Sequence, residues 1–284
     1  MRFGVTLFLT DRTIDPTEFA VEAEHRGFSS VWFPEHTHIP VSRDTPPPTG
    51  DDELADEYRR TLDPYIALAG CAAVTSRIRL GTGVGLVAQH DPVVLAKQIA
   101  TLDVMSKGRV SLGVGFGWNR EEMQTHGIHY GDRRAIAREH VLAMQQLWAN
   151  DVARFDGTHT QVPPSWQWPK PSQHVDGANG VPIFLGGGAG PILFSHVAEY
   201  GHGWMPIGGA GLGTAIPSLR ERVAEVGRDP LAIEIVPFGV MADASKLDRY
   251  QSLGVTESVL RVKAGLRDVV LNDLDRLAGI VERL

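Results

Sequence analysis

The chain has 284 residues, of which 43% are hydrophobic and 21% charged, so it can bury a large core and is too apolar to be disordered. Acidic residues outnumber basic ones by 34 to 27, which argues against nucleic acid or an anionic membrane as partner and favours a small molecule. The single cysteine, Cys71, excludes an internal disulfide bond. No stretch of about 20 apolar residues occurs, and we expect neither a membrane span nor a signal peptide. We therefore expect a cytoplasmic protein.

The first half of the chain repeats a strand followed by a helix. Helices are predicted to begin at three Asp-Pro pairs, because aspartate is a favoured N-cap residue and proline fits the first helical position. These pairs are Asp15 with Pro16, Asp63 with Pro64, and Asp91 with Pro92. Apolar stretches predict strands at 2–9, 29–33, 77–87 and 109–117. The alternation is typical of a parallel sheet.

Two irregular stretches interrupt this repeat. Residues 39–60 are rich in proline and polar residues, and we interpret them as a lid, since a loop of this length in a compact domain is usually functional. Residues 151–180 contain four prolines and two tryptophans, and we interpret them as an insertion on the surface.

The second half resumes the rhythm. It predicts helices at 191–200, 214–226, 246–253 and 268–284, and strands at 181–185, 203–207, 232–239 and 257–262. Eight strand and helix units predict an α/β protein whose residues 1–284 form a single (β/α)8 TIM barrel, with insertions after strand 2 and before strand 5. A doubly wound sheet is the alternative, but no linker divides the chain into halves.

Polar side chains follow the second predicted strand. The apolar run at 29–33 leads into Glu35, His36 and His38, and catalytic side chains of parallel barrels lie where the strands end. Three interpretations stay open, namely a metal site, histidines that only bond to the loop, and a proton donor that contacts substrate. We predict no metal, because the later strands end in glycine, proline and apolar residues rather than in further ligands.

A glycine-rich loop follows the fifth predicted strand. Residues Gly186 to Gly190 precede a helix that begins at Pro191, and backbone amides at such a helix start favour a phosphate group. The spacing matches neither the dinucleotide-binding motif nor the P-loop. The alternative is a tight turn that needs glycine for its backbone conformation alone.

Glycines also cluster at the ends of the third and fourth predicted strands, at 83, 85, 113, 115 and 117. Bare backbone at neighbouring strand ends would give a flat ring a surface to lie on, with Trp118 and Asn119 as a wall. The alternative is that these glycines only relieve crowding inside the barrel.

Several motifs along the chain resemble the bacterial-luciferase-like superfamily, and within it the flavin-dependent or deazaflavin (coenzyme F420) dependent oxidoreductases of actinobacteria. The matching stretches are F-A-V-E-A-E-H-R-G-F-S-S-V-W-F-P-E-H, L-D-P-Y-I-A-L-A-G-C-A-A-V-T-S-R-I-R-L-G-T-G-V, G-R-V-S-L-G-V-G-F-G-W-N-R-E-E-M, P-I-F-L-G-G-G and Y-G-H-G-W-M-P-I-G. Their order and spacing make the resemblance specific.

The resemblance implies a dimeric TIM barrel that holds its cofactor at the carboxyl ends of the strands. It implies a non-prolyl cis peptide between Gly83 and Val84, a phosphate bound at Gly187 to Gly190, and His36 near the reactive carbon of the cofactor. Trp118 stands where dehydrogenases of sugar phosphates have glutamate, so that substrate is doubtful. The expected cofactor contacts are Gly83, Val84, Gly115, Trp118, Asn119, Gly186, Gly187, Gly188, Ala189, Gly190 and Trp204.

Our first hypothesis is an F420-dependent oxidoreductase that transfers a hydride between the deazaflavin and a small organic substrate. His36, with Glu35, is the candidate catalytic group that gives or takes the proton. The alternative is an FMN-dependent luciferase-like monooxygenase. Two hypotheses from other classes are a metal-dependent hydrolase that uses His36 and His38, and a cofactor-binding protein without turnover.

Overall fold

A computed structural model describes residues 1–47 and 53–284. In its first half lie β1 (Arg2–Thr6), α1 (Pro16–His25), β2 (Ser30–Phe33), η1 (Asp56–Arg60), α2 (Pro64–Val74), β3 (Arg79–Thr82), η2 (Val87–Gln89), α3 (Pro92–Ser106), β4 (Val110–Val114), α4 (Arg120–Thr125) and α5 (Arg133–Ala149). In its second half lie β5 (Ala153–Asp156), β6 (Gln161–Ser165), β7 (His174–Val175), β8 (Ala178–Asn179), β9 (Ile183–Gly186), α6 (Pro191–Tyr200), β10 (Gly203–Met205), α7 (Leu212–Glu225), β11 (Glu234–Ile235), β12 (Phe238–Val240), α8 (Ala244–Ser252), β13 (Glu257–Arg261) and α9 (Arg267–Val281).

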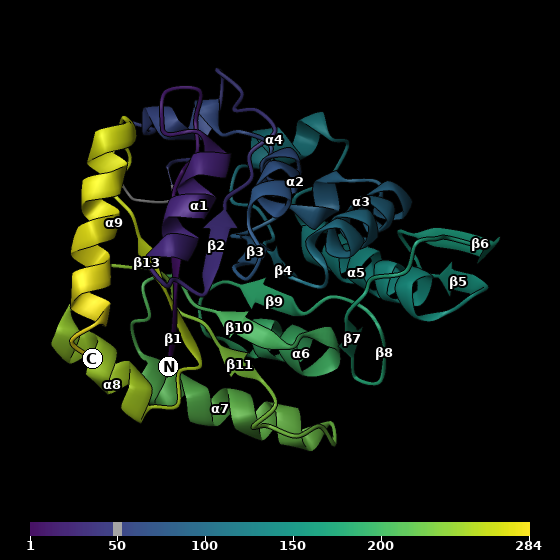
Figure 1. The fold of residues 1–284 in the computed structure, drawn as a ribbon. Coiled ribbons are helices and arrows are strands. Elements are labelled where there is room, and N and C mark those ends of the chain that lie inside the picture. Colours follow the sequence, from purple (N-terminus) through teal and green to yellow (C-terminus); the bar gives the residue numbers. More distant parts are fainter. Residues whose placement is uncertain (48–52) are drawn as a thin grey trace.

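The main sheet has nine parallel strands in the order β11-β10-β9-β4-β3-β2-β1-β13-β12. Its two outermost strands, β11 and β12, are consecutive in the chain and are separated only by Val236 and Pro237. Between them, the Val236 amide donates to the Trp204 carbonyl and the Val259 amide donates to the Pro237 carbonyl. Both edges of the ordered sheet thus belong to one stretch of chain, and helices surround the sheet (Figure 1). The predicted α/β class is confirmed.

The three predicted Asp-Pro helix starts are confirmed. Each aspartate carboxylate accepts a hydrogen bond from a backbone amide in the first turn: Asp15 from Thr17 at 2.8 Å, Asp63 from Ile66 at 2.9 Å, and Asp91 from Val93 at 2.9 Å. Each proline occupies the first helical turn, where its missing N–H leaves no helical bond unmade.

Some predicted strands are shorter than the apolar runs that suggested them. The stretch 77–87 forms a strand only at Arg79–Thr82, and the peptide bond between Gly83 and Val84 that follows is cis. Leu86 and Val87, which extend the apolar run, are buried beyond the strand rather than in the ladder. The stretch 232–239 is divided into β11 and β12, because the proline at 237 has no N–H to give to a neighbouring strand.

The stretch 151–180 contains two antiparallel pairs, β5 with β6 and β7 with β8. The β5–β6 hairpin projects beyond the helices at one side of the molecule (Figure 1). Of the predicted lid at 39–60, residues 48–52 lie outside the described residues, and the part at 56–60 is the short helix η1.

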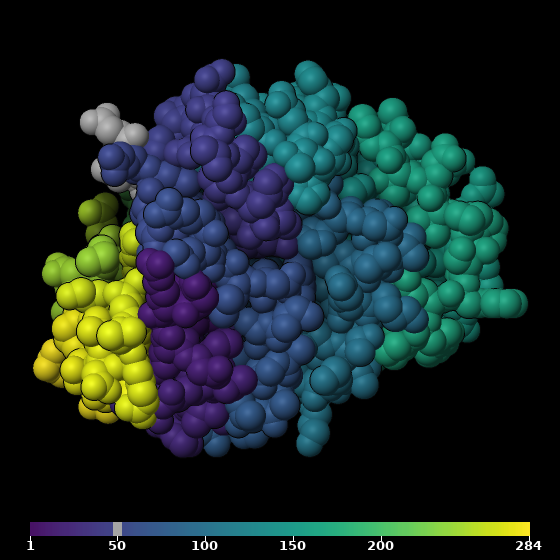
Figure 2. Space-filling view, turned by 90° about the horizontal axis from the view of Figure 1, so that it is seen from above, coloured from purple at the N-terminus to yellow at the C-terminus, as the bar shows by residue number. Residues whose placement is uncertain are grey.

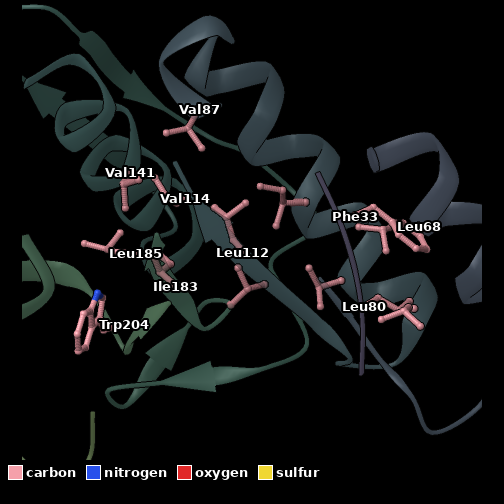
Figure 3. Packing of buried hydrophobic residues seen from close by; sticks show 14 of the residues in the cluster. Phe33, Leu68, Leu80, Val87, Leu112, Val114, Val141, Ile183, Leu185 and Trp204 are labelled. Atoms are coloured by element: carbon pink, nitrogen blue, oxygen red, sulfur yellow. The ribbon is translucent and has the colours of Figure 1, made fainter. Parts of the chain in front are cut away.

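Alternating side chains divide the buried residues of the strands into two groups. Outward side chains such as Leu112, Ile183 and Leu185 pack beneath the helices, in one cluster with Val141 of α5 (Figure 3). A smaller cluster lies on the other face of the strands and consists of Trp32, Phe184, Met205, Val236 and Val259. Such alternation is what a sheet buried on both faces requires.

The inner cluster depends on glycines opposite its two largest rings. Trp32 and Phe184 meet edge to face with their ring centroids 5.7 Å apart. A Cβ atom at Gly81 would lie 2.1 Å from the Trp32 ring, and one at Gly203 would lie 2.4 Å from the Phe184 ring. Strands 3 and 6 of the predicted barrel therefore carry glycine where the neighbouring strands carry large aromatic rings.

The single cysteine lies at the centre of helix α2. Cys71 is fully buried, and its thiol donates to the Pro16 carbonyl at 3.2 Å. Burial raises the pKa of the thiol to about 12.

The beginning and the end of the chain lie side by side. β1 pairs with β13 along its whole length, and the purple and yellow segments touch on the surface in Figure 2. Among the described residues, no helix combines the length and the apolar character needed to cross a membrane. The cytoplasmic location stays a prediction.

Gly113 tests this packing. In Gly113→Ala the new Cβ would lie 2.1 Å from the Thr82 carbonyl oxygen, a backbone atom that cannot turn away. We expect the free energy of unfolding, measured by urea denaturation, to fall by about 1–3 kcal/mol. In the control Gly279→Ala, no described atom outside the adjoining backbone of helix α9 is within 4 Å of the new Cβ, and we expect a gain of roughly 0.5–1 kcal/mol. Equal stability of Gly113→Ala and the wild type would contradict this account.

Candidate functional site

The loops that follow β2, β3 and β4 meet at the carboxyl ends of three neighbouring strands. The loop after β2 carries Glu35, His36 and His38, and the loop after β4 carries Trp118 and Asn119. Parallel strands place their carboxyl ends at one edge, which is the usual position of a barrel active site.

His36 is held by a buried acid. Its Nδ1 lies 2.9 Å from Oε2 of Glu122, a residue of helix α4 whose exposed fraction is 1%. The other carboxylate oxygen of Glu122 accepts a hydrogen bond from the Thr37 amide at 3.2 Å. The carboxylate therefore joins the loop after β2 to helix α4.

Aromatic side chains surround the remainder of the His36 ring. The Trp118 indole N–H donates to His36 Nε2 at 3.4 Å, and the two rings meet edge to face. The Tyr58 ring lies with its centroid 5.4 Å from that of His36 and 5.8 Å from that of Trp118. His36 thus faces a partly exposed aromatic wall built from η1 and the loop after β4.

The Glu35 carboxylate reaches from the loop after β2 to the loop after β3. The exposed fraction of Glu35 is 3%, and its carboxylate accepts from the Leu86 amide at 2.5 Å and pairs with His90 Nε2 at 2.6 Å. We predicted a catalytic role with His36, and this role stays a prediction. Both carboxylate oxygens already bond to groups of the protein. The structure indicates that Glu35 positions the loop after β3.

His38 lies in a separate polar group. The hydroxyl of Thr37 is 3.0 Å from His38 Nδ1 and 2.8 Å from His126 Nε2. Burial, together with the nearby His38, lowers the pKa of His126. Among residues 1–47 and 53–284, no three His, Cys, Asp or Glu side chains are grouped as a metal site would require.

The glycines at the strand ends do not form the open surface that we predicted. A Cβ atom at Gly83 would lie 2.5 Å from the Phe238 ring, and Cβ atoms at Gly115 and Gly186 would lie 2.3 Å and 2.8 Å from the Val84 side chain. These glycines leave room for side chains of the chain itself, which is the alternative we had stated. The surface at this point consists of the half-buried Val84 and Phe238.

The loop at 187–190 is open, in contrast. Apart from its own chain neighbours, no described atom lies within 4 Å of a Cβ built at Gly188 or Gly190. Gly190 is the N-cap of α6, and no side chain of residues 1–47 and 53–284 caps this ten-residue helix. The first amides of an uncapped helix are available to an anion.

Trp204 is hydrogen-bonded to this loop from β10. Its side chain is fully buried, its indole N–H donates to the Gly187 carbonyl at 2.9 Å, and its ring packs edge to face on Phe194. We expected direct contact with a cofactor, but a tryptophan without exposed surface is instead placed to fix the loop.

Asn119 caps helix α4. Its Oδ1 accepts from the amides of Glu121 and Glu122 at 3.2 Å and 3.3 Å, as an N-cap side chain does. Its Nδ2 is buried without a hydrogen-bond partner among the described residues. Whether this amide contacts a cofactor stays a prediction.

A family model described as "Luciferase-like monooxygenase" matches residues 10–253. The chain belongs to the luciferase-like monooxygenase family. An uncharacterized protein of Mycobacterium tuberculosis is 43% identical, over 100% of this chain and 97% of that protein. The F420-dependent glucose-6-phosphate dehydrogenase of Kineococcus radiotolerans is 30% identical, over 74% of this chain and 58% of that protein. The family consists of oxidoreductases, and this luciferase-like chain is an enzyme of that class.

A solved structure supports the fold of this luciferase-like enzyme. An F420-dependent secondary alcohol dehydrogenase in complex with an F420-acetone adduct superimposes with a TM-score of 0.76 at 19% identity, over 99% of each chain. The two chains therefore share one α/β fold, and the parallel sheet is consistent with a luciferase-like barrel.

Two arginines of the predicted lid, Arg59 and Arg60, are paired with acids. Arg60 lies 2.8 Å from Asp11 and 2.9 Å from Asp56, and Arg59 also pairs with Asp56. Their charges are already balanced within the protein.

Sequence reasoning missed three residues of this luciferase-like site. Glu122 follows a cap residue in a short helix, where acids usually lie in solvent. His90 precedes the third Asp-Pro pair, and Tyr58 lies in the irregular stretch 39–60. The local signal in the sequence was the apolar Met123 beside Glu122, which indicates that part of α4 faces inward. Met123 is buried in the structure.

The pair of His90 and Glu35 predicts a pH-dependent stability. Burial alone lowers the pKa of His90, but the hydrogen bond and the charge of Glu35 outweigh it and raise the pKa. Since the ordinary pKa of histidine is about 6.5, the pair stabilises the fold fully below that pH, and this contribution is lost as the pH rises through the raised pKa. In His90→Gln we expect a loss of about 1–3 kcal/mol at acidic pH and a smaller loss at alkaline pH, measured by urea denaturation.

The control for this experiment is His129→Gln, because His129 is exposed. We expect it to stay within about 0.5 kcal/mol of the wild type at both pH values. A loss in His90→Gln that is constant or grows with pH would show that the ion pair does not act as described.

Proposed function

We propose that this enzyme is an F420-dependent oxidoreductase that transfers a hydride between the deazaflavin and a small organic substrate. The observation that carries the proposal is His36, an imidazole at the carboxyl edge of the sheet with one nitrogen on a buried carboxylate and the other toward an aromatic wall. Such a group suits the proton exchange that accompanies hydride transfer to or from a carbon that bears oxygen. The 30% identity with an F420-dependent dehydrogenase supports the choice of cofactor.

Two parts of the site fit the cofactor. The exposed loop at Gly188, Ala189 and Gly190 would hold the phosphate, because its space is open and the uncapped start of α6 favours an anion. Val84 and Phe238 offer a half-buried apolar surface to the ring. Gly83, Gly115, Gly186, Gly187 and Trp204 act through packing or hydrogen bonds that shape these two parts.

The cofactor, when bound, accepts or gives the hydride, and the protein supplies placement and the proton. His36 Nε2 would exchange the proton with the substrate oxygen. Trp118 and Tyr58 would cover the site and exclude water, and the stretch 39–60, to which Tyr58 belongs, would act as the lid.

An FMN-dependent monooxygenase is the alternative. The family description names monooxygenases, and FMN shares with F420 the three-ring system and the phosphate. In this case the same phosphate loop and apolar surface would be used, while reduced flavin would react with oxygen.

We further propose that residues 1–284 form one (β/α)8 domain, with β11 and β12 as two parts of the seventh strand and with insertions at 39–60 and 151–180. We also propose a homodimer. Exposed apolar side chains lie on α2 and α3, namely Ile66, Val74, Val94 and Met105.

Cofactor titration and His36 test the proposed function. The titration is measured by fluorescence. We expect F420 to bind the cofactor-free protein at least about tenfold more tightly than FMN, a difference of about 1.4 kcal/mol in binding free energy.

The role of His36 is tested by kinetics. With the small alcohol or carbonyl compound that the wild type uses fastest, His36→Ala should lower kcat by about 10²–10⁴ and leave F420 affinity unchanged. The control is His38→Ala, which should keep the wild-type kcat. Tighter binding of FMN would favour the alternative, and an unchanged kcat in His36→Ala would exclude the histidine.

The phosphate loop gives a separate test. In Ala189→Asp the new carboxylate lies at the start of α6, where an acid favours the helix but repels a phosphate. We expect F420 affinity to fall about tenfold or more with no loss of thermal stability. Ala189→Ser, which adds no charge, should bind like the wild type. Wild-type affinity in Ala189→Asp would place the phosphate elsewhere.

A further inference from the structure

We propose that Glu122 is a positioning residue that fixes His36 in one tautomer, with the proton on Nδ1 and an unprotonated Nε2 that can accept. The use of that acceptor in turnover rests on the proposed function. The tautomer itself follows from contacts within the protein.

The Trp118 indole N–H is a group that can only donate. The Trp118 indole N–H lies 3.4 Å from His36 Nε2, so Nε2 must accept and cannot carry a proton in the neutral ring. The proton of a neutral imidazole is then on Nδ1, which lies 2.9 Å from Glu122 Oε2. The bond therefore runs from His36 Nδ1–H to the carboxylate.

The second carboxylate oxygen is equally constrained. Glu122 Oε1 accepts from the Thr37 amide, another group that can only donate. Glu122 must therefore accept at both oxygens at once, which a carboxylate does and an amide cannot. Asn119 holds the first turn of α4 by capping the Glu122 amide, and the buried Met123 follows, so the acid cannot turn away easily.

This arrangement decides which atom of His36 meets the substrate. Nδ1 is covered by Glu122, whereas Nε2 faces Trp118 and the site. In the oxidative direction the substrate O–H bond would break and its proton would form a bond to Nε2, in place of the hydrogen bond from Trp118. The bound deazaflavin would supply the acceptor for the hydride and its two electrons. The resulting imidazolium would lie against the buried Glu122 carboxylate, which stabilises it.

The sharpest variant is Glu122→Gln, which has the same shape. If its amide oxygen accepts from Thr37, its NH2 group faces Nδ1 and moves the histidine proton to Nε2, where it opposes the Trp118 N–H. If the amide is turned the other way, two donors meet at Thr37. The matched control is Glu121→Gln, since Glu121 is the neighbouring acid and bonds to the Asp44 amide and the Thr45 hydroxyl instead.

The measurement is the ring-nitrogen NMR spectrum of the 15N-labelled protein, at a pH well above the ordinary imidazole pKa of about 6.5, with and without F420. The His36 signals are assigned by their loss in His36→Asn. We expect the proton on Nδ1 in the wild type and in Glu121→Gln, and on Nε2, wholly or in part, in Glu122→Gln. In Glu122→Gln we also expect kcat to fall by about 10²-fold with unchanged F420 affinity.

A wild-type proton on Nε2, which needs no variant to observe, would overturn the inference. A Glu122→Gln protein that keeps the wild-type tautomer with no loss of stability would overturn it as well, because the turned amide would place two donors against each other at Thr37. Failure of F420 to bind, together with the expected tautomers, would overturn the proposed cofactor and leave the role of Glu122 supported. The two proposals can therefore fail separately.

Discussion

The structure depends on the packing of Trp32 against Phe184 on the inner face of the strands. Two large rings fit there only because Gly81 and Gly203 lie opposite them without side chains. Met205, Val236 and Val259 complete this inner cluster, so that strands distant in sequence share one packed layer. Since protein interiors tolerate little overpacking, the glycines are as necessary to the sheet as the aromatic residues.

This inner layer also places the candidate site. Val84 and Phe238 pack on the same cluster from the carboxyl side, which makes the floor of the site an extension of the core. The loop after β3 is then held by Glu35 and His90, and the loop after β2 by Glu122. Two buried carboxylates thus fix the geometry of the loops that surround His36, each by accepting bonds from backbone and histidine together.

Local signals in the sequence predicted much of the fold. Asp15, Asp63 and Asp91 cap helices as expected, because an N-cap acts within four residues and needs no partner elsewhere. The partners of buried acids could not be predicted in the same way. Glu122 meets His36 across 86 positions and Glu35 meets His90 across 55, and such pairs exist only once the strands are assembled. The open surface predicted at Gly83 and Gly115 is absent among the described residues for the same reason. The side chains that fill the space beside these glycines come from other strands or loops.

The burial of Cys71 has a practical consequence. Its thiol is buried between α2 and the start of α1, and with a pKa of about 12 almost none of it is in the nucleophilic thiolate form at neutral pH. Since it is also the only cysteine of the chain, a cysteine placed on the surface would be the single thiol that reacts readily with a maleimide. The natural background is already suited to attaching one fluorophore or spin label, for instance on the projecting β5–β6 hairpin, without first removing a native residue.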